Sequence, residues 1–309
     1  MAPAKKSVLI TGCSAGGIGA GLAEAFQQKG YHVFLTLRNL SKTPANLANE
    51  TNITVLQLDV LSAESITAAV ENVSKATSGR LDILINNSGQ NLVLPALDTT
   101  VEDARKIFDL NFFAPLAMIQ AFIPLLVKAQ GYVVNQSSAA GCMSMPFLSR
   151  PLLYFFPSFF QYLIHNAGIY SSSKAAMIAG SDIWRRELEP LGVRSMTLVT
   201  TSVKTPAFEN VTMPKVPENS YYYVIRDYVA RLGSGVLQEG APDPVTYGHS
   251  VVKAIEAGKI GEVWVGKDAS MNHWSWKLLP KSMFDSVLDG FLKVSGELAK
   301  VAQAAKKAK

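Results

Sequence analysis

Cysteine is scarce in this chain of 309 residues. Its two cysteines, Cys13 and Cys142, lie far apart, so no disulfide framework is indicated and we expect a reducing compartment. Charged residues make up 17% of the chain and hydrophobic residues 48%, which excludes a disordered or fibrous protein and fits a globular one with a sizeable core. No secretory signal is visible at the N-terminus, so we expect a protein that is not secreted.

Metal sites and nucleic-acid surfaces also lack their usual residues. The four histidines show no metal-ligand spacing and neither cysteine has a CxxC partner, so we expect no metal. Basic residues are not interleaved with aromatic ones, so we expect no nucleic-acid partner. The modest net charge of +5 fits an anionic cofactor or a membrane surface better.

Two periodicities alternate along the first 200 residues. Short, continuously apolar runs predict strands buried on both faces, at Ser7–Thr11, His32–Leu37, Ile53–Leu58, Asp82–Asn86, Gly131–Gln136 and Val193–Val199. Helical periodicity predicts helices between them, such as Gly19–Lys29, Ala63–Ala76, Val101–Lys128 and Ser171–Glu189. This alternation predicts an α/β fold with a doubly wound, mostly parallel Rossmann-type sheet and helices on both faces. We assign one domain to residues 1–270 and an amphipathic, basic extension to residues 271–309.

A glycine-rich loop, TGCSAGGIG, links the first predicted strand to the first helix at Thr11–Gly19. Glycines let the backbone turn sharply and approach a pyrophosphate, which then sits at the positive end of the helix. Because the loop stands between a strand and a helix, it predicts a dinucleotide site. Its predicted cofactor-binding residues are Gly12, Ser14, Gly17, Ile18 and Gly19.

The end of the second predicted strand indicates which dinucleotide is bound. An acid commonly stands there to hold a ribose 2′-hydroxyl, but this strand ends Leu-Arg38-Asn39 with Lys42 close behind. An arginine pairs with a 2′-phosphate that an acid would repel, so we predict NADPH/NADP⁺ as the cofactor. Alternatively, Arg38 is a solvated loop charge.

Two further turns belong to the same cleft, because ligands bind beyond the carboxyl ends of the strands in such a sheet. After the third strand, Asp59 either accepts a hydrogen bond from the adenine amino group or caps the next helix, and the two roles are compatible. A polar turn closes the fourth strand. We add Asp59, Val60, Asn87, Ser88 and Gly89 to the predicted cofactor site.

Tyr170 and Lys174 are four residues apart, which places both side chains on one face of a helix. A tyrosine with a pKa near ~10 is a poor acid–base catalyst, but an adjacent ammonium and the positive nicotinamide stabilise the phenolate and lower its pKa. Tyr170 can then give a proton to a carbonyl oxygen as hydride reaches the carbon. The preceding predicted strand ends in the serines of Asn135-Gln-Ser-Ser138, which strengthens this interpretation.

These motifs together resemble the short-chain dehydrogenase/reductase family from Val8 to about Phe208. The resemblance implies an NADP(H)-dependent oxidoreductase with Tyr170 as the acid–base group, Lys174 holding the ribose and tuning Tyr170, and Ser138 polarising the carbonyl. Asn111 matches the asparagine that supports a water-mediated proton relay. Val203 and Thr205 match positions that contact the nicotinamide half of the cofactor.

The chain departs from the family pattern in two places. Thr200-Thr201 stands where the family normally has Pro-Gly. Ser138 and Tyr170 are 32 residues apart, more than twice the family's usual separation, and the surplus coincides with an aromatic insertion at about 150–168. Within it, Pro151–Ile164 is too short to cross a bilayer. It is a buried insertion, a lid or lipid-facing patch, or an artefact of the gene model.

Two other apolar segments each allow two interpretations. Leu110–Val127 carries no charge, which is marginal for a membrane span, and a buried core or subunit-interface helix is favoured. Apolar residues recur at helical spacing from Lys281 to Lys309, with lysines nearby. This tail is either a solvated terminal helix or a helix on a membrane surface.

Within the family, the chain resembles the fungal NADPH-dependent 1-acyldihydroxyacetone-phosphate reductases. The loop Cys13–Gly19, the run Asn87–Asp98 and the C-terminal His273–Pro280 carry this resemblance. It implies an acylated ketone substrate, which becomes 1-acylglycerol 3-phosphate. It also implies peripheral association with a lipid surface, at the cytoplasmic face of the endoplasmic reticulum or at lipid droplets, or else a cytosolic protein. The substrate pocket is expected at Cys142–Leu148, in the insertion and in a loop region at 206–240.

Several alternatives stay open at this stage. The substrate is another ketone, such as a secondary-metabolite intermediate, or the insertion before Tyr170 leaves a protein that binds the cofactor without turnover. A membrane-anchored structural protein is disfavoured, because no uninterrupted span is present. By the family's habit, a homodimer or homotetramer is expected to form through the helices at Leu110–Val127 and Ser171–Glu189.

Overall fold

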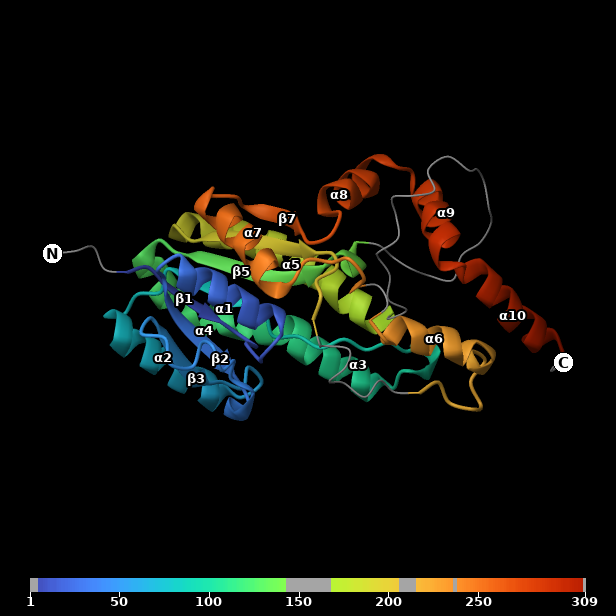
Figure 1. Ribbon diagram of the computed structural model, residues 1–309, viewed down its shortest axis with the longest axis horizontal. Helices are drawn as coiled ribbons and strands as arrows, with labels where there is room; N and C mark the ends of the chain where they lie inside the picture. The colour runs from blue at the N-terminus through green and yellow to red at the C-terminus, as the bar shows by residue number, and fades with distance from the viewer. Residues whose placement is uncertain (1–4, 143–167, 206–214, 236–237, 308–309) are drawn as a thin grey trace.

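The computed structural model describes residues 5–142, 168–205, 215–235 and 238–307. One seven-stranded sheet runs through it in the order β3-β2-β1-β4-β5-β6-β7, and each hydrogen-bonded pair of these strands is parallel (Figure 1). The strands are β1 (Ser7–Ile10), β2 (His32–Leu37), β3 (Ile53–Gln57), β4 (Ile83–Asn86), β5 (Tyr132–Ser138), β6 (Arg194–Thr200) and β7 (Gly261–Val265).

Helices connect and cover these strands. They are α1 (Ile18–Gln28), α2 (Ala63–Thr77), α3 (Val101–Phe108), α4 (Ala114–Ala129), α5 (Gly168–Leu188), α6 (Arg226–Gly233), α7 (Pro244–Glu256), α8 (Ala269–Leu278), α9 (Lys281–Leu292) and α10 (Val294–Lys307). Short 3₁₀ turns are η1 (Leu40–Lys42), η2 (Ala96–Asp98), η4 (Ala139–Gly141), η5 (Glu189–Leu191) and η7 (Tyr223–Ile225), and η3 (Asp109–Phe113) is a π-helical turn.

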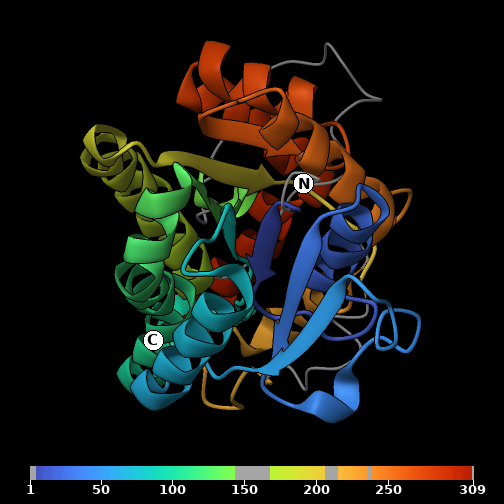
Figure 2. The same ribbon diagram turned by 90° about the vertical axis from the view of Figure 1, so that its left-hand side faces the viewer.

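Alternate residues of the strands face opposite helical layers. Val8 and Ile10 of β1 pack with α1 and α7, whereas Leu9 between them packs with α2 and α4. Both faces are therefore buried, which explains the continuously apolar strands. Figure 2 shows the two layers, with α1 and α7 on one side of the sheet and the green and cyan helices on the other. The sequence prediction of a doubly wound sheet is confirmed.

The sheet reverses its winding between β1 and β4. From β1 the chain moves outward to β2 and β3, then returns to pair β4 with the other side of β1, so that Val8 lies between Val33 and Ile83. A ligand crevice forms beyond the carboxyl ends of the strands at such a switch point. The predicted glycine loop and the Asn87–Gly89 turn follow β1 and β4, and so both lie at this crevice.

The structure corrects two predicted helices. The predicted helix Val101–Lys128 is interrupted by the π-helical turn Asp109–Phe113, which separates α3 from α4. The C-terminal tail is not one helix, because Lys293 adopts a left-handed conformation with φ +55° between α9 and α10. It is not simply solvated either, since Phe284 of α9 is buried against Trp276, and Leu298 of α10 packs on the same cluster.

By length and composition alone, the run Val101–Ala129 is the one described helix that could cross a membrane. Its α4 part packs Met118, Phe122 and Leu126 against the sheet, where all three are buried. The favoured interpretation of Leu110–Val127 as a core helix agrees with this packing. The predicted insertion at Pro151–Ile164 lies outside the described residues, as do residues 143–148, 206–214 and 236–237 of the predicted substrate pocket.

Candidate active site

The glycine loop between β1 and α1 is glycine-rich for steric reasons. Gly12 has φ +74°, a conformation that favours glycine. A Cβ on Gly19 would lie 2.5 Å from the carbonyl oxygen of Gly12, so a larger residue cannot fit. Gly17 is the N-cap of α1 and provides no side-chain cap, which leaves the first amides of the helix to an anionic ligand.

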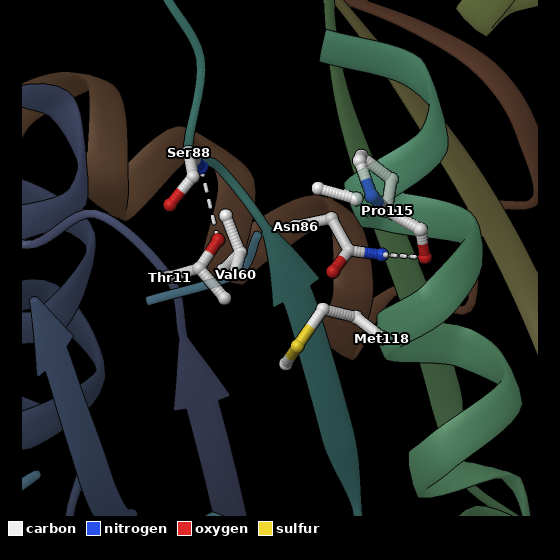
Figure 3. Close-up of a pocket in the computed structure, with 7 residues that line it drawn as sticks. Thr11, Val60, Asn86, Ser88, Pro115 and Met118 are labelled. Atoms are coloured by element: carbon white, nitrogen blue, oxygen red, sulfur yellow. Dashed lines mark hydrogen bonds between the residues drawn. The ribbon is translucent and has the colours of Figure 1, made fainter. Parts of the chain in front are cut away.

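Thr11 locks this loop to the turn after β4. Its hydroxyl oxygen accepts hydrogen bonds from the backbone amides of Asn87 and Ser88, each at 2.9 Å. The side-chain amide of Asn87 donates in return to the carbonyl oxygens of Thr11 and Gly12. Figure 3 shows Thr11, Ser88 and Val60 around a small pocket at the ends of β1 and β4. Sequence reasoning missed Thr11, although a polar residue directly after a buried strand is a usable signal.

Arg38 is exposed directly after β2. Asn39 caps the following turn η1, and the carbonyl oxygen of Lys42 in that turn accepts the backbone amide of Ala15 at 2.9 Å. The segment from Arg38 to Lys42 is therefore held against the glycine loop. A cation here lies at the edge of the crevice, as the prediction of a 2′-phosphate contact requires.

Asp59 does not cap α2. The N-cap is Ser62, whose hydroxyl accepts the amide of Ser65, while one carboxylate oxygen of Asp59 accepts the amide of Leu61 at 3.0 Å. Asp59 instead closes its own turn after β3, so the expected capping role is wrong. Its proposed contact with adenine stays a prediction. Val60 beside it is buried and lines the pocket in Figure 3.

Asn111 lies in the π-helical turn η3, a local geometry that often occurs at functional sites. Its side-chain amide donates to the carbonyl oxygen of Gln90 and to the hydroxyl of Ser173, each at 3.0 Å, and its oxygen accepts the amide of Gln90 at 2.9 Å. The hydroxyl of Ser173 donates in turn to the carbonyl oxygen of Tyr170. Asn111 thus ties the loop after β4 to the first turns of α5.

Tyr170, Lys174 and Ser138 come together at the carboxyl end of β5. The hydroxyls of Tyr170 and Ser138 are hydrogen-bonded, and the amide of Ala140 donates to the Ser138 hydroxyl at 3.2 Å. Lys174 Nζ lies 5.8 Å from the centroid of the Tyr170 ring. A Cβ on Gly141 would lie 2.6 Å from the carbonyl carbon of Lys174, so this glycine lets η4 approach α5 closely.

Burial determines the protonation states of Tyr170 and Lys174. Burial raises the pKa of Tyr170, and the hydrogen bond with Ser138 opposes the increase, so the expected lowering of that pKa does not occur in the protein alone. Burial also lowers the pKa of Lys174 from 10.5 to about 8. At neutral pH Tyr170 is therefore a protonated donor beside an ammonium that is still mostly charged.

The loop after β6 is fixed by side chains in place of the family's Pro-Gly. The hydroxyl of Thr201 donates to the carbonyl oxygen of Lys267 at 2.8 Å. Val203 is buried in the core beneath the loop, and the amide of Thr205 donates to the side chain of Gln238 at 3.0 Å. The predicted contacts of Val203 and Thr205 with the cofactor stay predictions.

Neither cysteine contributes a reactive thiol to this site. Both are free and buried, and burial raises the pKa of each thiol to about 12. A thiol in such surroundings stays protonated and is a poor nucleophile. Chemistry at this crevice therefore rests on the hydroxyl and ammonium groups described above.

The glycine loop lies at the switch point of a parallel sheet, and a tyrosine and a lysine share one face of α5. Together these features define a dinucleotide-binding α/β oxidoreductase. A sequence profile of the short chain dehydrogenases matches residues 6–150. A short-chain dehydrogenase of Penicillium ochrochloron is 38% identical over 283 residues, covering 92% of this chain and 96% of its own length. The chain belongs to the short-chain dehydrogenase/reductase family.

One further relative and one solved structure are less similar in sequence. The NADPH-dependent 1-acyldihydroxyacetone phosphate reductase of Schizosaccharomyces pombe is 36% identical over 230 residues, covering 73% of this chain and 71% of its own. A short chain dehydrogenase of Burkholderia cenocepacia, solved in complex with NADP, has a TM-score of 0.64 at 22% identity. That match covers 90% of this chain and 95% of the other, and it supports the fold.

Proposed function

We propose that this protein is an NADPH-dependent reductase that transfers a hydride to a ketone, with Tyr170 as the proton donor. The observation that carries the proposal is the cluster at the carboxyl end of β5. There the Tyr170 hydroxyl is hydrogen-bonded to Ser138, and Lys174 lies against the same ring. The four-residue spacing on α5 and the strand end of β5 produce this cluster together.

The residues of the crevice fit a dinucleotide. Gly12 and Gly19 form a cradle that a side chain would fill, and the uncapped amides of α1 suit a pyrophosphate. Arg38 and Lys42 suit a 2′-phosphate. Support comes from two relatives, because the Schizosaccharomyces pombe reductase is NADPH-dependent and the Burkholderia protein was solved with NADP.

The catalytic steps follow from the positions of four side chains. When bound, NADPH would supply the hydride that the carbonyl carbon receives. The Tyr170 hydroxyl gives its proton to the carbonyl oxygen, and Ser138 orients that oxygen by a hydrogen bond. Lys174 holds the ribose and stabilises the phenolate that Tyr170 becomes. Asn111 supports the route by which a proton returns to Tyr170.

For the ketone, we propose 1-acyl-dihydroxyacetone phosphate, with 1-acylglycerol 3-phosphate as the product. The Schizosaccharomyces pombe relative supports this choice, as does an exposed apolar edge on α8 and α9, formed by Trp274, Leu278 and Met283. The second candidate is a ketone of secondary metabolism, as proposed from the sequence. The 38% identity to a Penicillium short-chain dehydrogenase along nearly its whole length keeps that candidate open.

Steady-state assays with matched ketones decide between these substrates. NADPH oxidation would be followed with palmitoyl-dihydroxyacetone phosphate, with unacylated dihydroxyacetone phosphate and with a panel of cyclic and aromatic ketones. The proposal predicts turnover of the acylated substrate with a kcat/KM at least about 100-fold above that of the unacylated one, because an acyl chain adds buried apolar area. Preference for a ketone of the panel would replace the substrate and retain the reductase.

We also propose where the protein works and with what partners. Its partner is a small ketone, and it associates peripherally with the cytoplasmic face of the endoplasmic reticulum or with lipid droplets. A homodimer or homotetramer would form through the helices that carry Phe113 and Ile183, which are exposed large apolar residues. Light scattering on the purified chain would test this, and a monomer at micromolar concentration would contradict it.

A further inference from the structure

Three side chains form a closed ring of hydrogen bonds below the proposed active site. The side-chain amide of Gln136 donates to the hydroxyl oxygen of Thr200. The hydroxyl of Tyr247 donates to the amide oxygen of Gln136 at 3.1 Å, and it lies 2.6 Å from the Thr200 hydroxyl. Because Tyr247 donates its one hydroxyl proton to Gln136, Thr200 must donate to Tyr247, and within the ring each group donates once and accepts once. The side-chain amide of Gln136 also donates to the carbonyl oxygen of Ser137 at 3.2 Å.

The two hydroxyl groups of the ring are shielded from water, and Gln136 is half-buried. Tyr247 is 1% exposed and Thr200 is buried. Burial raises the pKa of Tyr247 to about 12, so its hydroxyl remains a donor over the whole physiological range. A missing member would break two of the three hydrogen bonds and leave the remaining pair with unused donor or acceptor capacity, which is costly for the buried hydroxyls.

The ring adjoins the catalytic lysine through the backbone of Gln136. Strand β4 pairs with β5 only as far as Asn86 opposite Asn135. The next carbonyl oxygen, that of Gln136, accepts Lys174 Nζ at 2.9 Å. The position of the Gln136 backbone therefore sets where the Lys174 ammonium lies.

The other two members connect the ring to the rest of the cofactor crevice. Thr200 is the last residue of β6 and starts the loop that carries Val203 and Thr205. Tyr247 lies in α7, and its neighbour Gly248 packs so closely on α1 that a Cβ there would lie 2.6 Å from the carbonyl oxygen of Gly21. Helix α1 begins at the glycine loop, where the pyrophosphate is proposed to bind. Tyr247 therefore connects that loop, through α7 and α1, to Gln136 beside Lys174.

We propose that Gln136, Thr200 and Tyr247 are positioning residues. Their hydrogen-bonded ring holds Lys174 and the loop after β6 at fixed positions relative to the glycine loop. The inference rests on the proposed function, because it assigns the ring to the same cofactor site. In this chain the ring includes Thr200, one of the two residues that stand where the family has Pro-Gly. Side-chain hydrogen bonds thereby supply the rigidity that a proline would give to that turn.

Four variants of the full chain test the ring. Thr200→Val removes the hydroxyl at nearly constant shape, and Thr200→Ser keeps it. Tyr247→Phe removes the second hydroxyl. Tyr132→Phe is the matched control, because the buried Tyr132 hydroxyl has no hydrogen-bond partner among the described residues. Thermal unfolding would identify the temperature at which all four are folded, and NADPH affinity would be measured there by fluorescence titration.

We expect NADPH to bind about five- to tenfold more weakly to Thr200→Val and to Tyr247→Phe, and within twofold of wild type to Thr200→Ser and Tyr132→Phe. Rescue by serine would not follow from a loss of packing, since serine lacks the methyl group that valine retains. Equal affinities for the valine and serine variants would overturn the proposal. Turnover is a separate readout. A wild type that binds NADPH but reduces no ketone would contradict the proposed function. The comparison of NADPH affinities would still decide whether the ring positions the cofactor site.

Discussion

Lys174 is only 5% exposed, and its burial has a cost in stability. The ammonium loses water and gains one hydrogen bond to a carbonyl oxygen, with no carboxylate at hydrogen-bonding distance among the described residues. The change in its pKa from 10.5 to about 8 corresponds to about 3 kcal/mol of unfavourable free energy for the charged form. The fold therefore retains this buried charge at a cost in stability, as the proposed role of Lys174 requires.

Replacing this charge should stabilise the protein while removing its activity. We expect Lys174→Met to raise the free energy of unfolding at pH 7 by about 1–3 kcal/mol. Between pH 8 and 10.5 the unfolded wild type binds more protons than the folded one, so wild-type stability rises with pH and the difference shrinks. Urea unfolding at pH 7 and pH 9.5 measures this, with the exposed Lys259→Met as control. A Lys174→Met protein less stable than wild type at pH 7 would contradict the account.

Arg38 tests the choice of cofactor. Reversing its charge should weaken NADPH binding at least about tenfold and NADH binding much less, because only NADPH carries a 2′-phosphate. Lys259→Asp makes the same charge reversal directly before the amino end of β7, away from the crevice, and should leave the ratio of the two affinities unchanged. Fluorescence titration of Arg38→Asp with both cofactors gives the result. An unchanged ratio would show that Arg38 is a solvated loop charge.

Among the elements, α1 and α7 interlock through glycines. A Cβ on Gly21 of α1 would lie 2.2 Å from the carbonyl carbon of Pro244 at the start of α7. We therefore expect Gly21→Ala to destabilise the protein by about 2–3 kcal/mol, because one of two helix backbones must move. Gly290 of α9 meets nothing within 4 Å, so Gly290→Ala should be neutral or stabilising by up to about 1 kcal/mol. Urea unfolding compares them, and equal effects would contradict the interlock.

Sequence patterns predicted the first six strands of the sheet well. Strand β2 is observed at its predicted bounds, and the other predicted strands differ by one or two residues. Strand β7 (Gly261–Val265) was missed because it lies beyond the first 200 residues, in which strand and helix patterns alternate, whereas β3, an edge strand of the same length, was predicted. The π-helical turn around Asn111 and the left-handed Lys293 were missed because neither a proline nor a glycine marks them.

The residues of the candidate site also fall into those that sequence patterns reveal and those that they miss. Tyr170 and Lys174, or the glycines of Thr11–Gly19, are close in sequence, so a local motif reveals them. The ring of Gln136, Thr200 and Tyr247 joins residues up to 111 positions apart. No local sequence motif marks these three residues. They come together only because β5 pairs with β6 and α7 packs on α1.

For the whole molecule, the net positive charge is concentrated in the C-terminal extension. The extension 271–309 holds seven lysines and three acidic residues, a net charge of +4 out of the chain's +5. Within it, Trp274 is 58% exposed and Leu278 is 72% exposed, one helical turn apart on α8. Helix α8 follows β7 directly and lies at the same end as the crevice (Figure 1). Apolar side chains flanked by lysines suit an anionic lipid surface.

We predict that the protein sediments with vesicles containing phosphatidic acid, and less with purely neutral phosphatidylcholine vesicles. Replacing Trp274 and Leu278 with serine should weaken this binding about tenfold, since two apolar anchors are lost. Serines at Leu191 and Ile260, which are exposed next to the amino ends of β6 and β7, form the matched control. Equal sedimentation of the two double variants would exclude α8 as the lipid-docking surface.

The central claim is that Tyr170 donates the proton in an NADPH-dependent ketone reduction. The most direct test compares wild type with Tyr170→Phe, measuring NADPH affinity by fluorescence and NADPH oxidation in the presence of palmitoyl-dihydroxyacetone phosphate and the ketone panel. Removing one hydroxyl should lower kcat by about 10³-fold or more and leave NADPH affinity within twofold of wild type. Undiminished turnover by Tyr170→Phe would contradict the account. So would a wild type that oxidises NADPH in the presence of none of the ketones tested.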